Sequence, residues 1–229
     1  AVTAAWPHLD HPDRFVRWAA LTAGQQQPLA EWKDRTRNEK YHNHRVAALL
    51  GQCKGAGADP ANGKPDAPVN KEVAAAVYNS LTKVDWGKLD YTGKLTLVRT
   101  YQIALVRFGD PDAGTVKKII AQLEPQFPAA TFEQNWLLCE TLAHLQAPTT
   151  AAKGIRLLQE AATQEEQIEY ARSLRRLKAG WTTELRTAYF NWFLKAANYR
   201  GGKSFSIFIE FIRRDAVASL SEEERVVLK

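Results

Sequence analysis

The string Gly202-Lys203-Ser204 matches the last positions of a phosphate-binding loop, which would place a nucleotide site in this chain. Such a loop also needs a glycine five residues before its Gly-Lys pair, a strand before it and a helix after it. The fifth residue before Gly202 is Ala197, and the preceding segment has a helical pattern. We therefore interpret the string as a junction between two helices, in which Gly201 and Gly202 end one helix and Ser204 caps the next.

The histidines and cysteines form no pattern that predicts a metal or haem site. His42 and His44 are two residues apart and would point to different faces of a helix, while His144 stands alone in an apolar run. Cys53 and Cys139 belong to no CxxC string. We expect Cys139 to be a buried, inert thiol, and a disulfide between the two cysteines stays open. We predict no catalytic, cofactor-binding or metal-binding residue, since no nucleophile elbow, HExxH or paired-carboxylate string is present.

Basic side chains are concentrated in residues 171–214, which hold ten Lys and Arg residues against two acidic ones. This local excess is larger than the net charge of +6 of the whole chain. Trp181, Tyr189, Trp192 and Tyr199 lie in the same stretch, and basic groups beside exposed aromatic rings could bind nucleic acid or another polyanion. We favour the alternative, in which the aromatic residues belong to the core and the arginines are solvated or contact helix C-terminal carbonyls.

The basic stretch also contains the candidate docking residues. In the string YARSLRRLKAG, the apolar positions Ala171, Leu174 and Leu177 predict a helix whose basic side chains point outward. Two further cations flank the Gly201-Gly202 turn, where free amides ahead of the next helix could add a weak anion site. The predicted site for an acidic partner or polyanion comprises Arg172, Arg175, Arg176, Lys178, Arg200 and Lys203.

The composition is that of an ordinary folded protein. Of the 229 residues, 45% are apolar and 24% are charged, which distinguishes the chain from disordered sequences. No apolar stretch approaches the roughly 18 residues of a membrane span. The chain begins at Ala1-Val2-Thr3 and contains no Met, so we expect a processed product or an excised fragment.

Helix start and stop signals recur along the whole chain, and no segment alternates convincingly as a strand. The segment FSIFIEFI is the best strand candidate, but Phe205, Phe208, Ile209 and Ile212 also recur at helical spacing, which favours a helix. We predict an all-α protein. The residues expected at helix starts are Asp10, Thr92, Asp112, Thr163 with Glu166, and Thr182 or Thr183, and those expected at helix ends are Gly24, Gly109 and Gly180.

Many helices joined by short turns predict antiparallel helix pairs stacked into an α-solenoid. The string HPDRFVRWAA resembles the first helix of a HEAT repeat, in which Asp13 and Arg17, four residues apart, would pair on the exposed side. We predict a single helical-repeat domain over residues 1–229, with a long exposed loop at about 51–70 that is rich in Gly, Pro, Asn and Asp. A linker between independent domains is the alternative interpretation of that loop.

Five strings carry a resemblance to a known family that covers most of the chain and is densest over residues 95–218: LVRTYQIALVRFGDPD, LEPQFPA, LLCETLAHLQAP, TQEEQIEYARSLR and GWTTELRTAYFNWFLKAANYRGGKSF. Together they resemble the helical, HEAT-like segment of large exported haem-binding proteins of planctomycetes and verrucomicrobia. In that family the segment follows a propeller-like, dehydrogenase-like domain and precedes a cytochrome c domain with a CxxCH motif. This chain contains neither neighbour, and Cys53 is followed by Lys54 and Cys139 by Glu140, so neither cysteine lies in a haem-attachment motif.

The resemblance implies export to the periplasm or cell surface, and a spacer or docking role beside redox domains. The expected function is that of a non-catalytic scaffold without a cofactor, whose partners are protein domains such as the neighbouring propeller-like and cytochrome c domains of a longer chain. The alternative is a nucleic-acid-binding helical-repeat protein or a DNA glycosylase-like enzyme that uses the basic stretch as its groove.

Overall fold

The computed structural model describes residues 1–56 and 69–227, and within them every regular element is a helix, as predicted. The chain divides into two compact units, residues 1–122 and residues 123–229. The predicted start of the loop at residue 51 is wrong, because helix α4 (His42–Ala56) includes residues 51–56. Gly51, Gln52 and Cys53 are buried on that helix, and the rest of the predicted loop from 57 to 68 lies outside the described residues.

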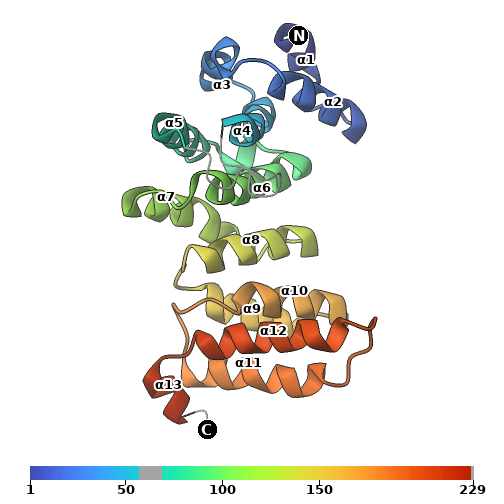
Figure 1. The fold of residues 1–229 in the computed structure, drawn as a ribbon, viewed down its shortest axis with the longest axis vertical. Helices are drawn as coiled ribbons and strands as arrows, with labels where there is room; N and C mark the ends of the chain where they lie inside the picture. The colour runs from blue at the N-terminus through green and yellow to red at the C-terminus, as the bar shows by residue number, and fades with distance from the viewer. Residues whose placement is uncertain (57–68, 228–229) are drawn as a thin grey trace. The chain divides into compact units, whose positions relative to one another are not determined.

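Unit 1 is built around α4. This helix packs against α2, α3, α5 and α6, and its core side chains Val46, Leu49 and Cys53 are at most 1% exposed. The surrounding helices of unit 1 (Figure 1) are α1 (Val2–Ala5), α2 (Arg14–Gln25), α3 (Lys33–Asn38), α5 (Lys71–Leu81), α6 (Tyr91–Phe108) and α7 (Ala113–Leu123), whose last residue falls in unit 2.

A side chain near the end of α7 ties three elements of unit 1 together. Gln122 donates hydrogen bonds from Nε2 to the backbone carbonyls of Leu81 (3.1 Å) and Val84 (2.7 Å), and its Oε1 accepts one from the Tyr101 hydroxyl (2.6 Å). Tyr101 is fully buried on α6, so its hydroxyl needs this partner.

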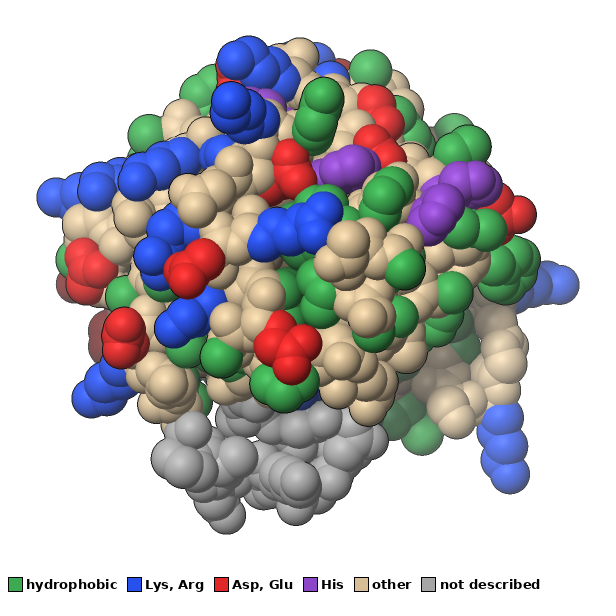
Figure 2. All heavy atoms as spheres, turned by 90° about the horizontal axis from the view of Figure 1, so that it is seen from above, with side chains coloured by type: hydrophobic (Ala, Val, Ile, Leu, Met, Phe, Trp, Pro, Cys, Tyr) green, Lys and Arg blue, Asp and Glu red, His purple; other side chains and the backbone are tan. Residues whose placement is uncertain are grey.

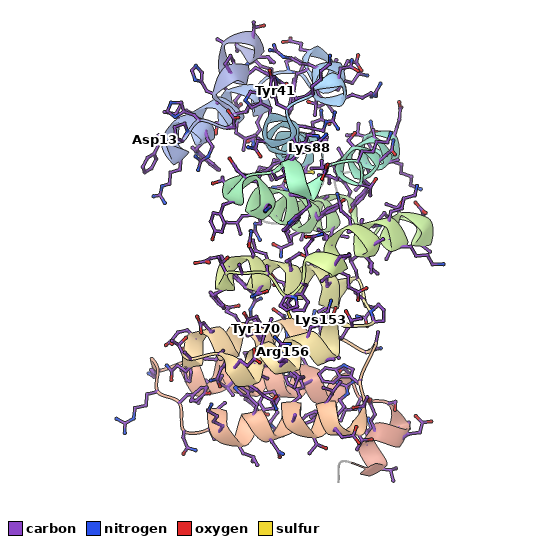
Figure 3. The ribbon with its side chains drawn as sticks, turned by 180° about the vertical axis from the view of Figure 1, so that it is seen from behind. Asp13, Tyr41, Lys88, Lys153, Arg156 and Tyr170 are labelled. Atoms are coloured by element: carbon purple, nitrogen blue, oxygen red, sulfur yellow. The ribbon has the colours of Figure 1, made fainter. Side chains whose placement is uncertain are left out.

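Unit 2 contains α8 (Phe132–His144), α9 (Thr150–Glu160), α10 (Gln164–Leu174), α11 (Thr183–Ala196), α12 (Phe205–Ala218) and α13 (Glu222–Val227). Helix α10 packs against α8, α9 and α12, and α11 and α12 run antiparallel side by side (Figure 1). Figure 3 labels Lys153 on α9, whose Nζ donates to the carbonyl of Glu124 (3.0 Å), and Tyr170 on α10, which is buried with its ring edge-on to Phe132.

Several predicted helix boundaries are confirmed by backbone contacts. Asp112 accepts hydrogen bonds from the first turn of α7, and Thr163 and Thr182 accept them from the first turns of α10 and α11. Gly109 ends α6 with a φ of 80°, and the segment FSIFIEFI lies in α12.

Other predicted boundaries are wrong by a few residues. Helix α2 is capped by Asp13 rather than Asp10, because the Asp13 carboxylate accepts from the amides of the first turn. That contact also removes the predicted Asp13–Arg17 pair, since Arg17 donates instead to the backbone carbonyls of His11 and Pro12. Similarly, α6 is capped by Asp90 and not by Thr92. The two glycines predicted to end helices also lie elsewhere: Gly24 is inside α2, and Gly180 is in the turn that follows α10.

No helix of the described residues is both long enough and apolar enough to span a membrane.

Candidate docking surface

The predicted docking site begins with Arg172, Arg175, Arg176 and Lys178. Of these four cations, Arg172 alone lies on a helix. Helix α10 ends at Leu174, so the prediction that Arg175, Arg176 and Lys178 share this helix is wrong. The Arg172 side chain is 22% exposed and binds the carboxylates of Glu140 (2.9 Å) and Glu169 (2.8 Å). Its charge is therefore balanced by residues of its own unit.

The next two arginines converge on one carboxylate. Arg175 and Arg176 each lie 3.1 Å from Oδ2 of Asp215, which is on α12, forty residues away in the sequence from Arg175. Burial by itself would raise the pKa of Asp215, but the hydrogen bonds and charges of the two guanidinium groups outweigh it and hold the pKa below its ordinary value. The two arginines hold the turn after α10 against α12, and half of their combined positive charge is neutralised.

The remaining three predicted cations are exposed. Lys178, Arg200 and Lys203 have no side-chain ion pair among the described residues. Gly202 and Lys203 lie in the loop between α11 and α12, and Ser204 occupies the position before α12 but makes no capping bond, which corrects that detail of the prediction. The element before this loop is helix α11 and not a strand, as expected for a helix junction.

The aromatic residues of the basic stretch are structural. Tyr189 and Trp192 are 0% and 6% exposed, and the Tyr189 hydroxyl donates to the carbonyl of Ala171 (2.6 Å). Gln167 accepts hydrogen bonds from the Trp192 indole (3.2 Å) and from the hydroxyl of Tyr199. The rings of Tyr189 and Trp192 belong to the core of unit 2 and cannot stack on bases, which confirms the favoured interpretation for these two residues, whereas Trp181 and Tyr199 are half-buried.

One basic residue of the stretch is buried, which the sequence did not reveal. Arg186 is 1% exposed and pairs with Glu224 on α13 (2.8 Å), while its guanidinium lies 4.2 Å from the centre of the Trp181 ring. A signal for this helix was present in the string SEEER, because Ser221 and Glu224 form a reciprocal capping box.

Helix α12 carries apolar side chains both on its buried face and on its exposed surface. Ile209, Ile212 and Ala216 are buried against unit 2. Three further apolar residues of this helix are exposed, Ile207 (55%), Phe208 (42%) and Phe211 (49%), which we call the α12 stripe. Because these three apolar side chains lie within five residues of one helix and are exposed together, the α12 stripe is the surface of this unit most suited to a partner.

The charges next to the α12 stripe are mainly positive. The Arg214 guanidinium lies 4.9 Å from the centre of the Phe211 ring and has no carboxylate partner among the described residues. Lys203 lies two residues before the start of α12. Arg213 is paired with Glu210 (2.8 Å) and adds no net charge. The stripe is thus an apolar strip with unpaired cations at its margin.

The described residues contain no group of His, Cys, Asp and Glu side chains placed to hold a metal ion. His44 binds a single carboxylate closely, that of Asp10 (2.7 Å). Cys53 and Cys139 are both free and fully buried, and burial raises the pKa of each thiol to about 12. Both cysteines are structural thiols.

Searches of protein-family models, of curated proteins and of solved structures found no match to this chain.

Proposed function

We propose that this chain is a non-catalytic docking module of a larger exported, redox-linked protein, built as a HEAT-like α-solenoid of antiparallel helix pairs. Within this proposal the α12 stripe binds an acidic amphipathic helix of a partner domain. The single observation that carries it is that α12 buries Ile209 and Ile212 on one face while Phe208 and Phe211 are exposed on another. Export, and partners of the propeller-like and cytochrome c type, rest on the family resemblance alone.

The cations beside the α12 stripe favour an acidic partner. An apolar helix face that meets Ile207, Phe208 and Phe211 would place its flanking side chains near Arg214 and Lys203. Carboxylates at those positions would pair with cations that lack partners within the described residues, whereas lysines there would be repelled.

The surface supports a protein partner better than a nucleic acid. A groove that reads DNA or RNA combines free phosphate-binding cations with exposed rings. Here Arg172, Arg175 and Arg176 are bound to carboxylates of their own unit, and the rings of Tyr189 and Trp192 are buried. The two exposed rings of the α12 stripe are phenylalanines on a helix, a pattern suited to an apolar helix face.

The test is a titration with a labelled amphipathic helical peptide that carries leucines at three- and four-residue spacing and glutamates on its other face. Fluorescence anisotropy would follow its binding to the whole chain. Truncation of a half-exposed anchor costs about 1 to 2 kcal/mol, so Phe211→Ala should raise Kd roughly 5- to 30-fold. The same peptide with lysines in place of glutamates should bind more weakly.

The matched control is Phe15→Ala in unit 1. Phe15 is also an exposed helical phenylalanine (68%) with an arginine, Arg14, over its ring at 4.7 Å. Its removal should leave Kd unchanged. Equal effects of the two substitutions would refute the site. Tighter binding of duplex DNA or heparin than of the acidic peptide, lost in Lys203→Ala, would favour the nucleic-acid alternative.

A further inference from the structure

Two aromatic side chains of helix α2 are exposed on the surface of unit 1. Phe15 is 68% exposed and Trp18 is 58% exposed, although α2 is held to its unit through the buried residues Ala20 and Leu21. Side chains three residues apart lie on the same side of a helix, so the two rings form one surface. In Figure 2, hydrophobic side chains reach the surface at the right edge, where Figure 1 places α2, and Lys or Arg side chains project beside them. A pair of exposed aromatic rings is a candidate binding surface.

Each of these rings has a cation over its face. The guanidinium carbon of Arg14 lies 4.7 Å from the centre of the Phe15 ring, and Nζ of Lys54 lies 4.6 Å from that of Trp18. Lys54 comes from α4, so the arrangement joins two helices of the unit. We call Arg14, Phe15, Trp18 and Lys54 the α2 patch. It presents positive charges and apolar rings side by side.

The charge at the α2 patch is positive. Arg14 and Lys54 have no carboxylate partner among the described residues. Burial lowers the pKa of Lys54, and repulsion from Arg107 and Arg99 lowers it further, while no acidic side chain of the described residues acts in the other direction. The nearest carboxylate in the sequence is that of Asp13, which accepts hydrogen bonds from the first-turn amides of α2. Even with Asp13 counted against Arg14, the charges of Lys54 and Arg99 remain, so an occupant of this surface has to be negative as well as partly apolar.

The cations over the rings separate the possible occupants. A nucleic-acid base stacks on the face of an aromatic ring, and a partner helix packs its apolar side chains there. In the α2 patch a cation already covers one face of both rings, whereas Phe208 of the α12 stripe has no cation over it among the described residues. A lipid bilayer does not need those faces. Tryptophan and phenylalanine enter the boundary between headgroups and acyl chains, while Lys and Arg beside them pair with anionic headgroups.

We infer that the α2 patch attaches this chain to the surface of an anionic lipid bilayer. The rings of Phe15 and Trp18 enter the headgroup boundary, and Arg14 and Lys54 pair with lipid phosphates. Two rings and a few cations give reversible attachment to the surface rather than insertion. This attachment is independent of the docking function proposed for the α12 stripe, because it uses a surface of the other unit.

Sedimentation of the whole chain with lipid vesicles tests this attachment. Vesicles of equal parts phosphatidylglycerol and phosphatidylcholine should bind the chain at least about tenfold more strongly than pure phosphatidylcholine, because each cation near an anionic surface strengthens binding roughly fivefold. Added sodium chloride should weaken the binding, since it screens exposed charges. Arg14→Gln should weaken it roughly fivefold, and Trp18→Ala roughly tenfold through the lost indole. Both residues are exposed, so neither variant should unfold the chain.

Phe211→Ala is the matched control, because Phe211 is an exposed phenylalanine of unit 2 with Arg214 over its ring at 4.9 Å. This variant should bind the anionic vesicles like the wild type. Equal binding of the wild type to both kinds of vesicle, or a loss in Phe211→Ala as large as that in Trp18→Ala, would overturn the proposal. Tighter binding of single-stranded oligothymidylate than of the anionic vesicles, lost in Trp18→Ala, would overturn it as well and assign the α2 patch to nucleic acid.

Discussion

The ion pair between Arg186 and Glu224 provides the sharpest test of how unit 2 is held together. The Arg186 guanidinium is 1% exposed and binds Glu224 through two contacts, Nε to Oε1 at 2.8 Å and Nη2 to Oε2 at 3.3 Å. It also donates to the hydroxyl (3.2 Å) and the carbonyl (3.4 Å) of Ser219. The pair therefore joins α11 to the short helix α13 across a sequence separation of 38 residues. Glu224→Gln removes the negative charge and keeps the size of the side chain.

The size of the expected loss of stability in Glu224→Gln follows from the burial of Arg186 and Glu224. Breaking a fully buried pair costs about 3 to 5 kcal/mol, because one charge is left uncompensated. Glu224 is 27% exposed, and Arg186 keeps its bonds to Ser219 and its contact with Trp181, so the cost should be smaller. We expect Glu224→Gln to lower the free energy of unfolding by about 1.5 to 3 kcal/mol.

The same pair predicts a dependence on pH. Burial opposes ionisation of Glu224, but the hydrogen bonds from Arg186 and from the Ser221 amide, together with the charge of Arg186, outweigh it and lower the pKa below the ordinary value of 4.5. A depressed pKa in the folded state means that the contribution is complete above pH 4.5 and is lost as the pH falls through the lowered value. The difference in stability between wild type and Glu224→Gln should therefore shrink below pH 4.5.

The assay is urea unfolding followed by tryptophan fluorescence, since Trp181 is stacked on Arg186 and reports its surroundings. Glu223→Gln is the matched control, because Glu223 is exposed on the same helix and should change the stability by less than about 0.5 kcal/mol. Equal midpoints for Glu223→Gln and Glu224→Gln at pH 7 would refute the reasoning.

Two further predictions concern the buried cysteines and the conformation of two glycines. Cys53 and Cys139 should resist iodoacetamide at pH 8 in the native chain and react fully in urea, because burial raises their pKa to about 12; rapid native labelling counted by mass spectrometry would contradict this. Gly180→Ala should destabilise by about 2 to 4 kcal/mol, since Gly180 has a φ of 73° and a Cβ there would lie 2.0 Å from the carbonyl oxygen of Pro148. Gly24→Ala should stabilise the chain by about 0.5 to 1 kcal/mol, because Gly24 lies inside α2 and a Cβ there would meet no atom within 4 Å. Thermal melts in which Gly180→Ala is more stable than Gly24→Ala would show that the backbone argument is wrong.

The helices could be predicted from the sequence because their signals are local. Asp112, Thr163 and Thr182 bind amides two or three residues away, which a short string reveals. Errors arose where two candidate caps were close together, as with Asp10 and Asp13, since only the backbone path decides between them.

The docking site could be predicted only in part, because charges pair across space. The basic string predicted a free cationic surface, but Asp215 lies 39 residues from Arg176 and neutralises part of it. The exposure of Phe211 likewise depends on which face of α12 meets the core, and helical spacing alone allowed either. Helical spacing groups the apolar residues of a segment, but only the packing of the helix decides which of them other helices cover.

The α12 stripe as the docking surface is tested most directly by hydrogen–deuterium exchange of the whole chain with and without the acidic amphipathic peptide. The account predicts that exchange slows in residues 205–218 and is unchanged in α2, which carries the exposed rings of Phe15 and Trp18 as an internal reference. Slower exchange in α2 but not in residues 205–218, or no change in either while the peptide is bound, would contradict it.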